Sequence, residues 1–224
     1  MGKRGPKPKK LIDTTWRPNL AYAVGLLVTD GCLAKDNLLV DLTSKDKEQL
    51  ENYSKCLGVK FKISKKSSGA GHEGLRIQFK NRLFYDFLLS IGLTPAKSKT
   101  VGVVAIPDEY FFDFLRGSFD GDGCFYSYWD PRWRSSHMFY VEFVSASKKH
   151  VEWLQKELQN RLGVIGHITR DGRKVTFQLK YAKKEGLEII KKMYYNPKVI
   201  CLTRKRIKIK TALKIEETQQ KRYY

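Results

Sequence analysis

Two aspartates of the chain stand in matching sequence contexts. Asp30 follows the apolar stretch LAYAVGLLVT, Asp122 follows FFDFLRGSFDG, and each is succeeded by Gly-Cys. The stretches predict helices over about 20–29 and 108–121 that end at Asp-Gly, where the glycine can take a left-handed cap. A carboxylate at this partly negative end of a helix costs about 0.3–1 kcal/mol. Two such placements point to a partner that compensates the charge.

The two aspartates belong to an internal repeat. Aligning Gly25 with Gly117 also brings Asp30 onto Asp122, with the Gly-Cys that follows each in register. After each copy the sequence predicts, in the same order, a strand pair, a helix, a second strand pair and a helix. We therefore expect an α+β fold built from two pseudo-symmetric αββαββα repeats.

The predicted repeats divide the chain into three parts. We expect a flexible basic arm at residues 1–17, a first repeat at 18–104 and a second at 105–224. Within the first, Gly58 stops a helix and strands follow at VKFKIS and LRIQFK; within the second, Asp171-Gly172 predicts a two-residue hairpin.

Small residues predict how the two aspartates come together. Ala21, Gly25 and Thr29 recur every four positions in the first predicted helix, as do Gly117 and Gly121 in the second. Such stripes let two helix backbones approach closely. If the two helices pack on each other, their terminal aspartates lie side by side at one edge of the molecule.

Paired carboxylates at two negative helix ends repel each other unless they share a proton or bind cations. Carboxylates, carbonyl oxygens and nearby phosphates are the ligands that Mg²⁺ prefers. The alternative, that each aspartate only satisfies local backbone groups, suits either copy alone. The duplication favours a divalent metal site between Asp30 and Asp122.

Alternation along the predicted strands separates an apolar face from a basic one. Val59, Phe61 and Ile63 lie on the core side in the first repeat, whereas Val175 and Phe177 do so in the second. The opposite faces carry almost no acid, which suits two-stranded ribbons that read base edges and touch phosphates. The expected DNA-contacting residues are Lys60, Lys62, Arg76, Gln78, Lys80, His167, Thr169, Arg173, Lys174, Thr176, Gln178 and Lys180.

The composition agrees with a nucleic-acid partner. The chain of 224 residues has 43 Lys and Arg against 23 Asp and Glu, a formal charge of +20. A charge of this sign and size predicts a polyanionic partner, because Lys and Arg displace condensed counterions. No apolar run reaches the roughly 20 residues of a membrane span, and no export signal is expected. The four cysteines are far apart, so we expect reduced, mostly buried thiols and no zinc site.

The motifs AVGLLVTDG (23–31) and LRGSFDGDG (115–123) resemble the paired signature motifs of the LAGLIDADG homing endonucleases. The order of strands and helices after each motif is also similar, over nearly the whole chain. The first motif departs more, with Val28 in place of the earlier aspartate of the pattern and Thr29 in place of a small residue. Two copies in one chain resemble the monomeric, pseudo-symmetric members.

The resemblance implies a monomer with a saddle of two antiparallel sheets over a long, pseudo-palindromic site in double-stranded DNA. It implies metal-dependent hydrolysis of both strands across the minor groove, leaving 3′ overhangs. Mg²⁺ or Mn²⁺ would support cleavage and Ca²⁺ binding alone, with Asp30 and Asp122 as ligands and backbone carbonyls of Thr29 and Gly121 completing the coordination.

The resemblance also implies a basic residue from each repeat near the scissile phosphates. Lys97 and Lys205 are the first choices, with Lys99 and Arg204 as further candidates. Each could offset charge that develops on the phosphorane, or simply anchor a phosphate.

Two other functions fit the same scaffold. One is an RNA maturase that assists splicing of its own intron, and the other is a DNA-binding regulator that does not cut. Both motif acids are present, which favours cleavage. An intracellular location is expected, in a compartment that the sequence does not specify.

Overall fold

A computed structural model describes residues 9–67, 73–172 and 175–220. Arg173 and Lys174, two of the expected DNA contacts, lie outside the described residues. The first repeat is built, in chain order, from α1 (Pro18–Asp30), β1 (Gly31–Leu33), β2 (Leu39–Ser44), α2 (Lys47–Leu57), β3 (Ile63–Ser67), β4 (Glu73–Lys80) and α3 (Arg82–Ser90).

The second repeat follows the same order and then adds a helix. After the 3₁₀ turns η1 (Lys97–Lys99) and η2 (Asp108–Tyr110) come α4 (Phe111–Asp122), β5 (Cys124–Trp129), β6 (His137–Ser145), α5 (Lys148–Leu162), β7 (His167–Arg170), β8 (Phe177–Ala182), α6 (Lys183–Met193) and the long α7 (Thr203–Gln220). The predicted αββαββα order is confirmed in both halves.

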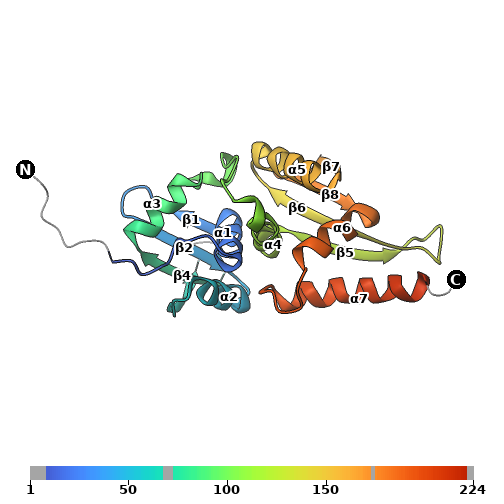
Figure 1. Ribbon diagram of the computed structural model, residues 1–224, viewed down its shortest axis with the longest axis horizontal. Helices are drawn as coiled ribbons and strands as arrows, with labels where there is room; N and C mark the ends of the chain where they lie inside the picture. Colours follow the sequence, from blue (N-terminus) through green and yellow to red (C-terminus); the bar gives the residue numbers. More distant parts are fainter. Residues whose placement is uncertain (1–8, 68–72, 173–174, 221–224) are drawn as a thin grey trace, which may run out of the picture.

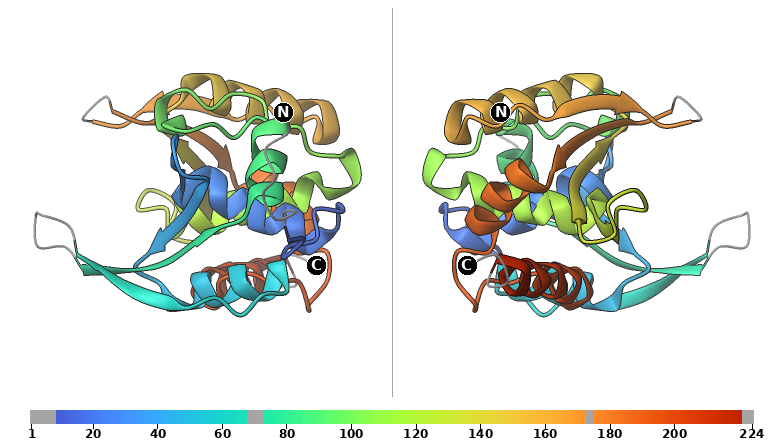
Figure 2. Two further views of the ribbon diagram at one scale, coloured as in Figure 1. Left: turned by 90° about the vertical axis from the view of Figure 1, so that its left-hand side faces the viewer. Right: turned by 90° about the vertical axis from the view of Figure 1, so that its right-hand side faces the viewer.

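Each repeat forms its own four-stranded antiparallel sheet. The strand orders are β1-β2-β4-β3 and β5-β6-β8-β7, so corresponding strands occupy corresponding places. The repeats lie side by side with α1 and α4 between them (Figure 1). The β3–β4 and β7–β8 ribbons both reach toward the same side of the molecule (Figure 2). The predicted α+β fold of two matched repeats is therefore confirmed.

The contact between α1 and α4 depends on the predicted small residues. A Cβ added to Gly25 would lie 2.2 Å from the carbonyl oxygen of Phe114, and one added to Gly117 would lie 2.1 Å from that of Tyr22. Real Cβ atoms do not come so near backbone oxygens. The two helices therefore pack backbone against backbone, as the small-residue stripes predict.

The predicted left-handed caps after the two aspartates are wrong. Gly31 has φ −85° and Gly123 has φ −75°, so both are extended and lead directly into the next strand. Space, and not backbone conformation, demands glycine here: a Cβ at Gly31 would lie 2.5 Å from the carbonyl oxygen of Leu27. By contrast, Gly58 ends α2 with φ 68°, the left-handed cap that the sequence predicts.

Residues 9–17 are not the expected flexible arm. Ile12 is 1% exposed and belongs to the hydrophobic core, and the side-chain amide of Asn81 donates to the carbonyl of Lys9. This segment therefore packs on the first repeat, because it carries an apolar residue that the core accepts. Residues 1–8 lie outside the described part of the chain.

Two strand predictions need correction at their ends. β3 begins at Ile63 and not at residue 59, so Lys60 and Lys62 precede the sheet, although Phe61 still stacks on Phe79 with ring centroids 4.4 Å apart. Val175, expected on the core side, is 58% exposed because β8 begins two residues later, at Phe177.

No helix in residues 9–67, 73–172 and 175–220 is long and apolar enough to cross a membrane.

Candidate active site

The tips of α1 and α4 touch at their last residues. A Cβ added to Gly121 would lie 1.9 Å from Oγ1 of Thr29 and 2.9 Å from Oδ2 of Asp30. The end of one motif helix thus lies directly against the other. Only a glycine at this place in α4 lets Asp30 lie so near the end of the helix that carries Asp122.

Both carboxylates have raised pKa values, and the charge of Asp122 contributes to the shift of Asp30. Burial, and then the charge of Asp122, raise the pKa of Asp30 to about 6. Asp122 keeps access to solvent, but the surrounding protein still raises its pKa, against the opposing charges of Lys205 and Lys97. Burial and a like charge both disfavour a second negative charge, and a bound cation would relieve both effects.

Lys97 and Lys205 lie beside the helix tips, but not as expected. Both are buried, and Lys97 Nζ donates to the carbonyls of Val28 and Gly31, each at 2.7 Å. Lys205 Nζ donates to the carbonyls of Phe119, Asp120 (2.9 Å), Gly121 (3.4 Å) and Gly123 (2.7 Å). The lysines therefore compensate the negative helix ends. From the sequence, bound cations or a shared proton were expected to do so.

Burial lowers the pKa of both lysines to about 8. For Lys97, the nearby Cys32, Asp122 and Asp30 oppose that shift. Lysines that already donate to several carbonyls have few donors left for a phosphate. Their position fits a role in holding the aspartates better than direct contact with the reacting phosphate. Lys99 is exposed on η1.

Gln49, at the start of α2, is a site residue that the sequence argument missed. It is 3% exposed, its Nε2 donates to Asp30 Oδ2 at 2.5 Å, and its Oε1 accepts from Ser44 Oγ at 2.8 Å. The amide is thus held at both ends and fixes the Asp30 carboxylate. One sequence signal points to Gln49: it precedes Leu50 on the inner face of a predicted helix. A long polar side chain at such a position needs a buried partner.

Asp120 is a second missed residue, an acid in the motif LRGSFDGDG that is turned inward. It is fully buried, and its Oδ2 accepts from the hydroxyl of Tyr22 at 2.7 Å and from the backbone N–H of Leu202 at 2.8 Å. Burial raises its pKa to about 6. This acid ties α4 to α1 and to the start of α7, which carries Lys205.

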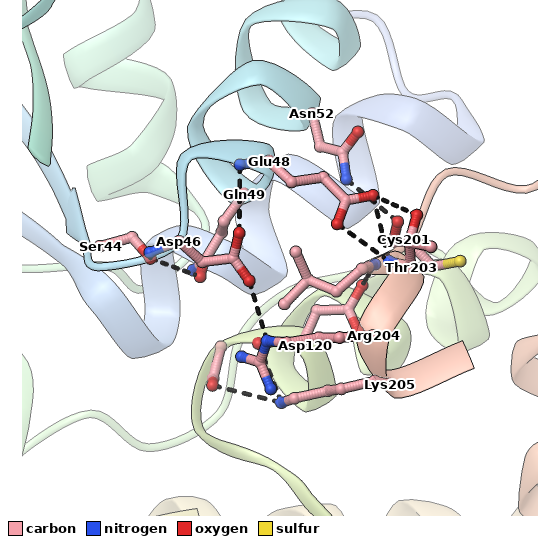
Figure 3. Close-up of polar contacts among 12 residues, drawn as sticks. Ser44, Asp46, Glu48, Gln49, Asn52, Asp120, Cys201, Thr203, Arg204 and Lys205 are labelled. Carbon is pink, nitrogen blue, oxygen red and sulfur yellow. Dashed lines mark hydrogen bonds and ion pairs between the residues drawn. The ribbon is translucent and has the colours of Figure 1, made fainter. Parts of the chain in front are cut away.

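Arg204 and its neighbours connect the two repeats (Figure 3). Arg204 Nε donates to Asp46 Oδ2 at 2.8 Å, and Glu48 accepts from the backbone N–H of Thr203 at 3.1 Å. Asn52 Nδ2 donates to the carbonyl of Cys201 at 3.1 Å. Residues of α2, in the first repeat, therefore anchor the segment that brings Lys205 to the second motif helix.

The polar sheet faces carry most of the residues that the sequence predicts to contact DNA. Arg76 pairs with Thr43 and Ser64 across the first sheet, and Gln178 pairs with Thr169 across the second. Strand partners share a face, so these side chains are neighbours. On the same faces lie Gln78, Lys80, His167 and Lys180. Thr176 is half-buried just before β8, and Lys60 and Lys62 are exposed before β3.

The expectation that these faces carry almost no acid is wrong. Asp41 and Glu142 lie at corresponding places in the central strands β2 and β6, both largely buried. Asp41 accepts from Gln78 Nε2 at 3.1 Å, and Arg76 NH1 lies 3.8 Å away. Glu142 lies 3.8 Å from Lys180 Nζ. The acids hold cationic and amide side chains in fixed orientations on the faces.

Two of the four cysteines, Cys32 and Cys124, follow the motifs onto the same faces. All four are free thiols, Cys56 and Cys201 buried, Cys32 and Cys124 exposed, so the expected burial holds for half of them. Cys32 pairs with Asp41 and Cys124 with Glu142.

Asp30, Asp122 and the helix ends beside them can hold a hard divalent cation if a DNA phosphate supplies further ligands. Among residues 9–67, 73–172 and 175–220, no group of three or more His, Cys, Asp and Glu forms a metal cage. Asp30 and Asp122 offer carboxylate oxygens at helix ends that also present carbonyls. Mg²⁺ is commonly bound by one or two carboxylates together with substrate phosphates and water, so this donor set fits it.

Comparison with known proteins shows what the chain is similar to. Residues 109–194 match the sequence profile of a LAGLIDADG-like domain. The homing endonuclease I-WcaI, solved bound to its DNA recognition sequence, superposes with a TM-score of 0.60 at 16% identity, over 91% of this chain and 93% of that one. The meganuclease I-SmaMI, bound to uncleavable DNA, gives 0.61 at 14% identity and 92% of each chain.

A third solved structure, the N-terminal LAGLIDADG domain of WhiA, gives a TM-score of 0.53 at 15% identity over 85% of this chain and 89% of that domain. No curated protein sequence matches the chain significantly. The part of the second repeat from residue 109 to 194 is thus similar to a LAGLIDADG-like domain. The whole chain has the fold of the two-repeat LAGLIDADG homing endonucleases.

Proposed function

We propose that this chain is a site-specific endonuclease that hydrolyses both strands of double-stranded DNA with the help of divalent metal. One observation carries the proposal: Asp30 and Asp122 stand at the touching tips of α1 and α4, where burial and the charge of Asp122 raise the pKa of Asp30 to about 6. A bound divalent cation would offset the negative charge of this pair, and the phosphates of a duplex would complete the coordination of the cation.

Each group near the tips has a role in this chemistry. Asp30 and Asp122, with the backbone carbonyls of Thr29 and Gly121, would hold Mg²⁺ or Mn²⁺. When bound, the metal supplies an activated water and stabilises the leaving 3′ oxygen. Gln49 keeps Asp30 in place through its 2.5 Å hydrogen bond. No serine, cysteine or histidine nucleophile is required.

Lys97 and Lys205 act through the helices. By donating to the last carbonyls of α1 and α4, they offset the helix-end charge that would otherwise oppose two carboxylates. They are positioning residues in this proposal, which revises the expectation that they neutralise the phosphorane directly. Lys99 is exposed, and Arg204 keeps guanidinium donors besides the Nε that pairs with Asp46, so both could bind phosphates.

The substrate we propose is a long, pseudo-palindromic duplex bound by one copy of the chain. The matched sheet faces of the two repeats would each contact one half-site, and their Lys, Arg and Gln side chains suit base edges and phosphates. Cleavage across the minor groove would leave 3′ overhangs. I-WcaI and I-SmaMI, which share the fold, were solved with DNA bound.

The test begins with a library of randomised duplexes. Protein in Ca²⁺ selects bound duplexes, and the recovered sequence, cloned in a plasmid, is then treated with Mg²⁺. We expect linear product with 3′ overhangs from the wild type. Asp30→Asn and Asp122→Asn should bind the duplex and fail to cut both strands, while Asp86→Asn, an exposed acid on α3, cuts normally. Normal double-strand cutting by either motif variant would refute the assignment of the site.

Charge and sheet faces alone would also serve a protein that binds nucleic acid without cutting, such as an RNA maturase or a DNA-binding regulator. The same selection separates these functions. A selected duplex that stays intact in Mg²⁺ and Mn²⁺ would favour the regulator, and selective retention of structured RNA over duplex DNA would favour the maturase.

A further inference from the structure

The two aspartates border different cavities. Asp30 and Gly121 open on a cavity of about 410 Å³ that is also lined by Gln49 and Arg204. Asp122 opens on one of about 220 Å³, together with Thr29 and His150. Thr29 and Gly121 hold matching places in the two motifs, so each cavity combines the acid of one repeat with the motif helix of the other.

The two cavities are counterparts under the repeat. Because Asp41 matches Glu142 in the sheets, Thr43 and Ser44 of the first cavity match Val144 and Ser145 of the second. In the same register Lys45 matches Ala146, and Gln49 matches His150. Differences between the linings are therefore changes at equivalent positions.

The linings differ in charge. Three cationic side chains, Lys45, Lys66 and Arg204, line the Asp30 cavity together with the acids Asp46 and Glu73. Arg204 Nε is paired with Asp46 Oδ2 at 2.8 Å, which leaves its other guanidinium N–H groups and the two lysines for a phosphate. Among the described residues that line the Asp122 cavity there is no lysine or arginine, and the lining includes small polar and apolar residues such as Ser145, Ala146 and Val144. Aligning Lys97 with Lys205 puts Ala96 in the place of Arg204. A phosphate at the first cavity meets cationic donors that a phosphate at the second lacks.

The groups beside the acids differ as well. Gln49 donates to Asp30, whereas His150 turns its Nδ1 toward the carbonyl of Gly102 at 2.8 Å. A carbonyl can only accept, so Nδ1 carries the proton and His150 does not take the place that Gln49 has beside Asp30. In the second cavity, the buried hydroxyl of Ser118 has no hydrogen-bond partner. The Asp122 side is thus less fully organised.

We infer that the two halves of the site act unequally. The strand whose scissile phosphate lies at the Asp30 cavity is held by Arg204 and Lys45 and is cut first, and the strand at the Asp122 cavity is cut more slowly, so that a nicked duplex accumulates. This inference rests on the proposed nuclease function. It assigns Lys45 and Arg204 to phosphate binding on one strand.

The first experiment follows each strand separately. The selected duplex, labelled with a different dye on each strand, is treated with the holoenzyme in Mg²⁺ under single-turnover conditions. We expect rate constants that differ by about tenfold, the size of one charge-assisted contact. Equal rates would overturn the inference and leave the proposed function intact. If neither strand is cut, both fall together.

A reciprocal exchange tests the cause. Lys45→Ala should slow the fast strand severalfold and leave the slow strand unchanged, and Ala146→Lys should speed the slow strand. Lys47→Ala is the matched control, since Lys47 is an exposed lysine two residues away that pairs with Glu51. If the two strands are cut at different rates but neither substitution changes those rates, the assignment to these cavities is contradicted.

A binding measurement without metal gives an independent readout. Single methylphosphonates, which remove one phosphate charge, are placed in turn along each strand of the selected duplex, and affinity is measured in EDTA. Neutralising the scissile phosphate of the fast strand should weaken binding about tenfold, against about twofold for the slow strand. Arg204→Ala should abolish that difference, and an unchanged difference would overturn the role of Arg204.

Discussion

The two repeats match closely at the α1–α4 contact but differ in the two cavities beside it. Across the contact the repeats still match: Gly25 and Gly117 each meet a backbone oxygen of the other helix, and each helix end receives a buried lysine. In the cavities the match is lost, with lysine against alanine and glutamine against histidine at equivalent positions.

The difference follows from what each region tolerates. Backbone-to-backbone packing leaves no room for any side chain, so both copies of the motif must keep their small residues. Lys45 and Arg204 of the cavity linings are exposed, so a change of side chain at these positions costs little stability. The α1–α4 contact, where the repeats match, therefore sets the spacing of the two acids. The cavities, where the repeats differ, can bind and cut the two DNA strands at different rates.

The largest effect is expected where the match is strictest. In Gly117→Ala the new Cβ would lie 2.1 Å from the carbonyl oxygen of Tyr22, so α1 and α4 must separate. We expect a loss of about 3 kcal/mol or more in the free energy of unfolding, measured with urea. Gly102→Ala is the control, because nothing lies within 4 Å of a Cβ there. Equal stability of the two variants would show that the helices do not touch as described.

A smaller loss is expected at the helix ends. Lys205→Met keeps the side chain's bulk but leaves the carbonyls of Phe119, Asp120 and Gly123 without their donor. Unpaired buried acceptors should cost about 2–4 kcal/mol in urea unfolding. Lys97→Met should behave alike if the two ends are truly equivalent. Stability unchanged in both variants would contradict the compensating role of the lysines.

The raised pKa values predict a pH dependence of stability without metal. Asp30 and Asp120 have a pKa of about 6 in the folded chain and near 4 when unfolded, so between these values the folded state binds more protons. The free energy of unfolding in EDTA should therefore fall as pH rises from about 4 to 6, by at most about 3 kcal/mol for each carboxyl.

Asp30→Asn should remove its own share of that fall, which urea titrations at several pH values can resolve. If the variant keeps the full pH dependence of the wild type, the Asp30 carboxyl is not perturbed as described.

The smallest effect is expected between α2 and the start of α7. Glu48→Gln weakens the contact with the N–H of Thr203, which lies at an exposed position (Figure 3). We expect a loss of about 1 kcal/mol or less. Thermal melts of this variant beside Glu51→Gln, an exposed acid on the same helix, would measure it. A loss above that of Lys205→Met would mean that the inter-repeat contact dominates.

The sequence predicts the fold well because its signals are local or repeated. Alternation in LRIQFK gives β4, Gly58 ends α2 in the left-handed conformation, and the duplicated Gly and Asp positions give the packing of α1 on α4. These features depend on neighbours within a few residues or on comparing one copy with the other.

The rest of the site depends on contacts between distant segments. Gln49 reaches Asp30, and Lys205 reaches across to the end of α4, through tertiary packing that no spacing rule reveals. The extended Gly31 and Gly123 were mispredicted because crowding by the preceding turn, and not a turn of the backbone, requires glycine. Asp41 was missed because its cationic partners lie on other strands.

The central claim, that Asp30 and Asp122 together hold cations against bound DNA, has a direct test. Calorimetric titration of Ca²⁺ into the complex with the selected duplex should show binding for the wild type and for Asp86→Asn, and a loss of at least about tenfold in affinity for Asp30→Asn and for Asp122→Asn. Wild-type affinity in either motif variant would contradict the claim.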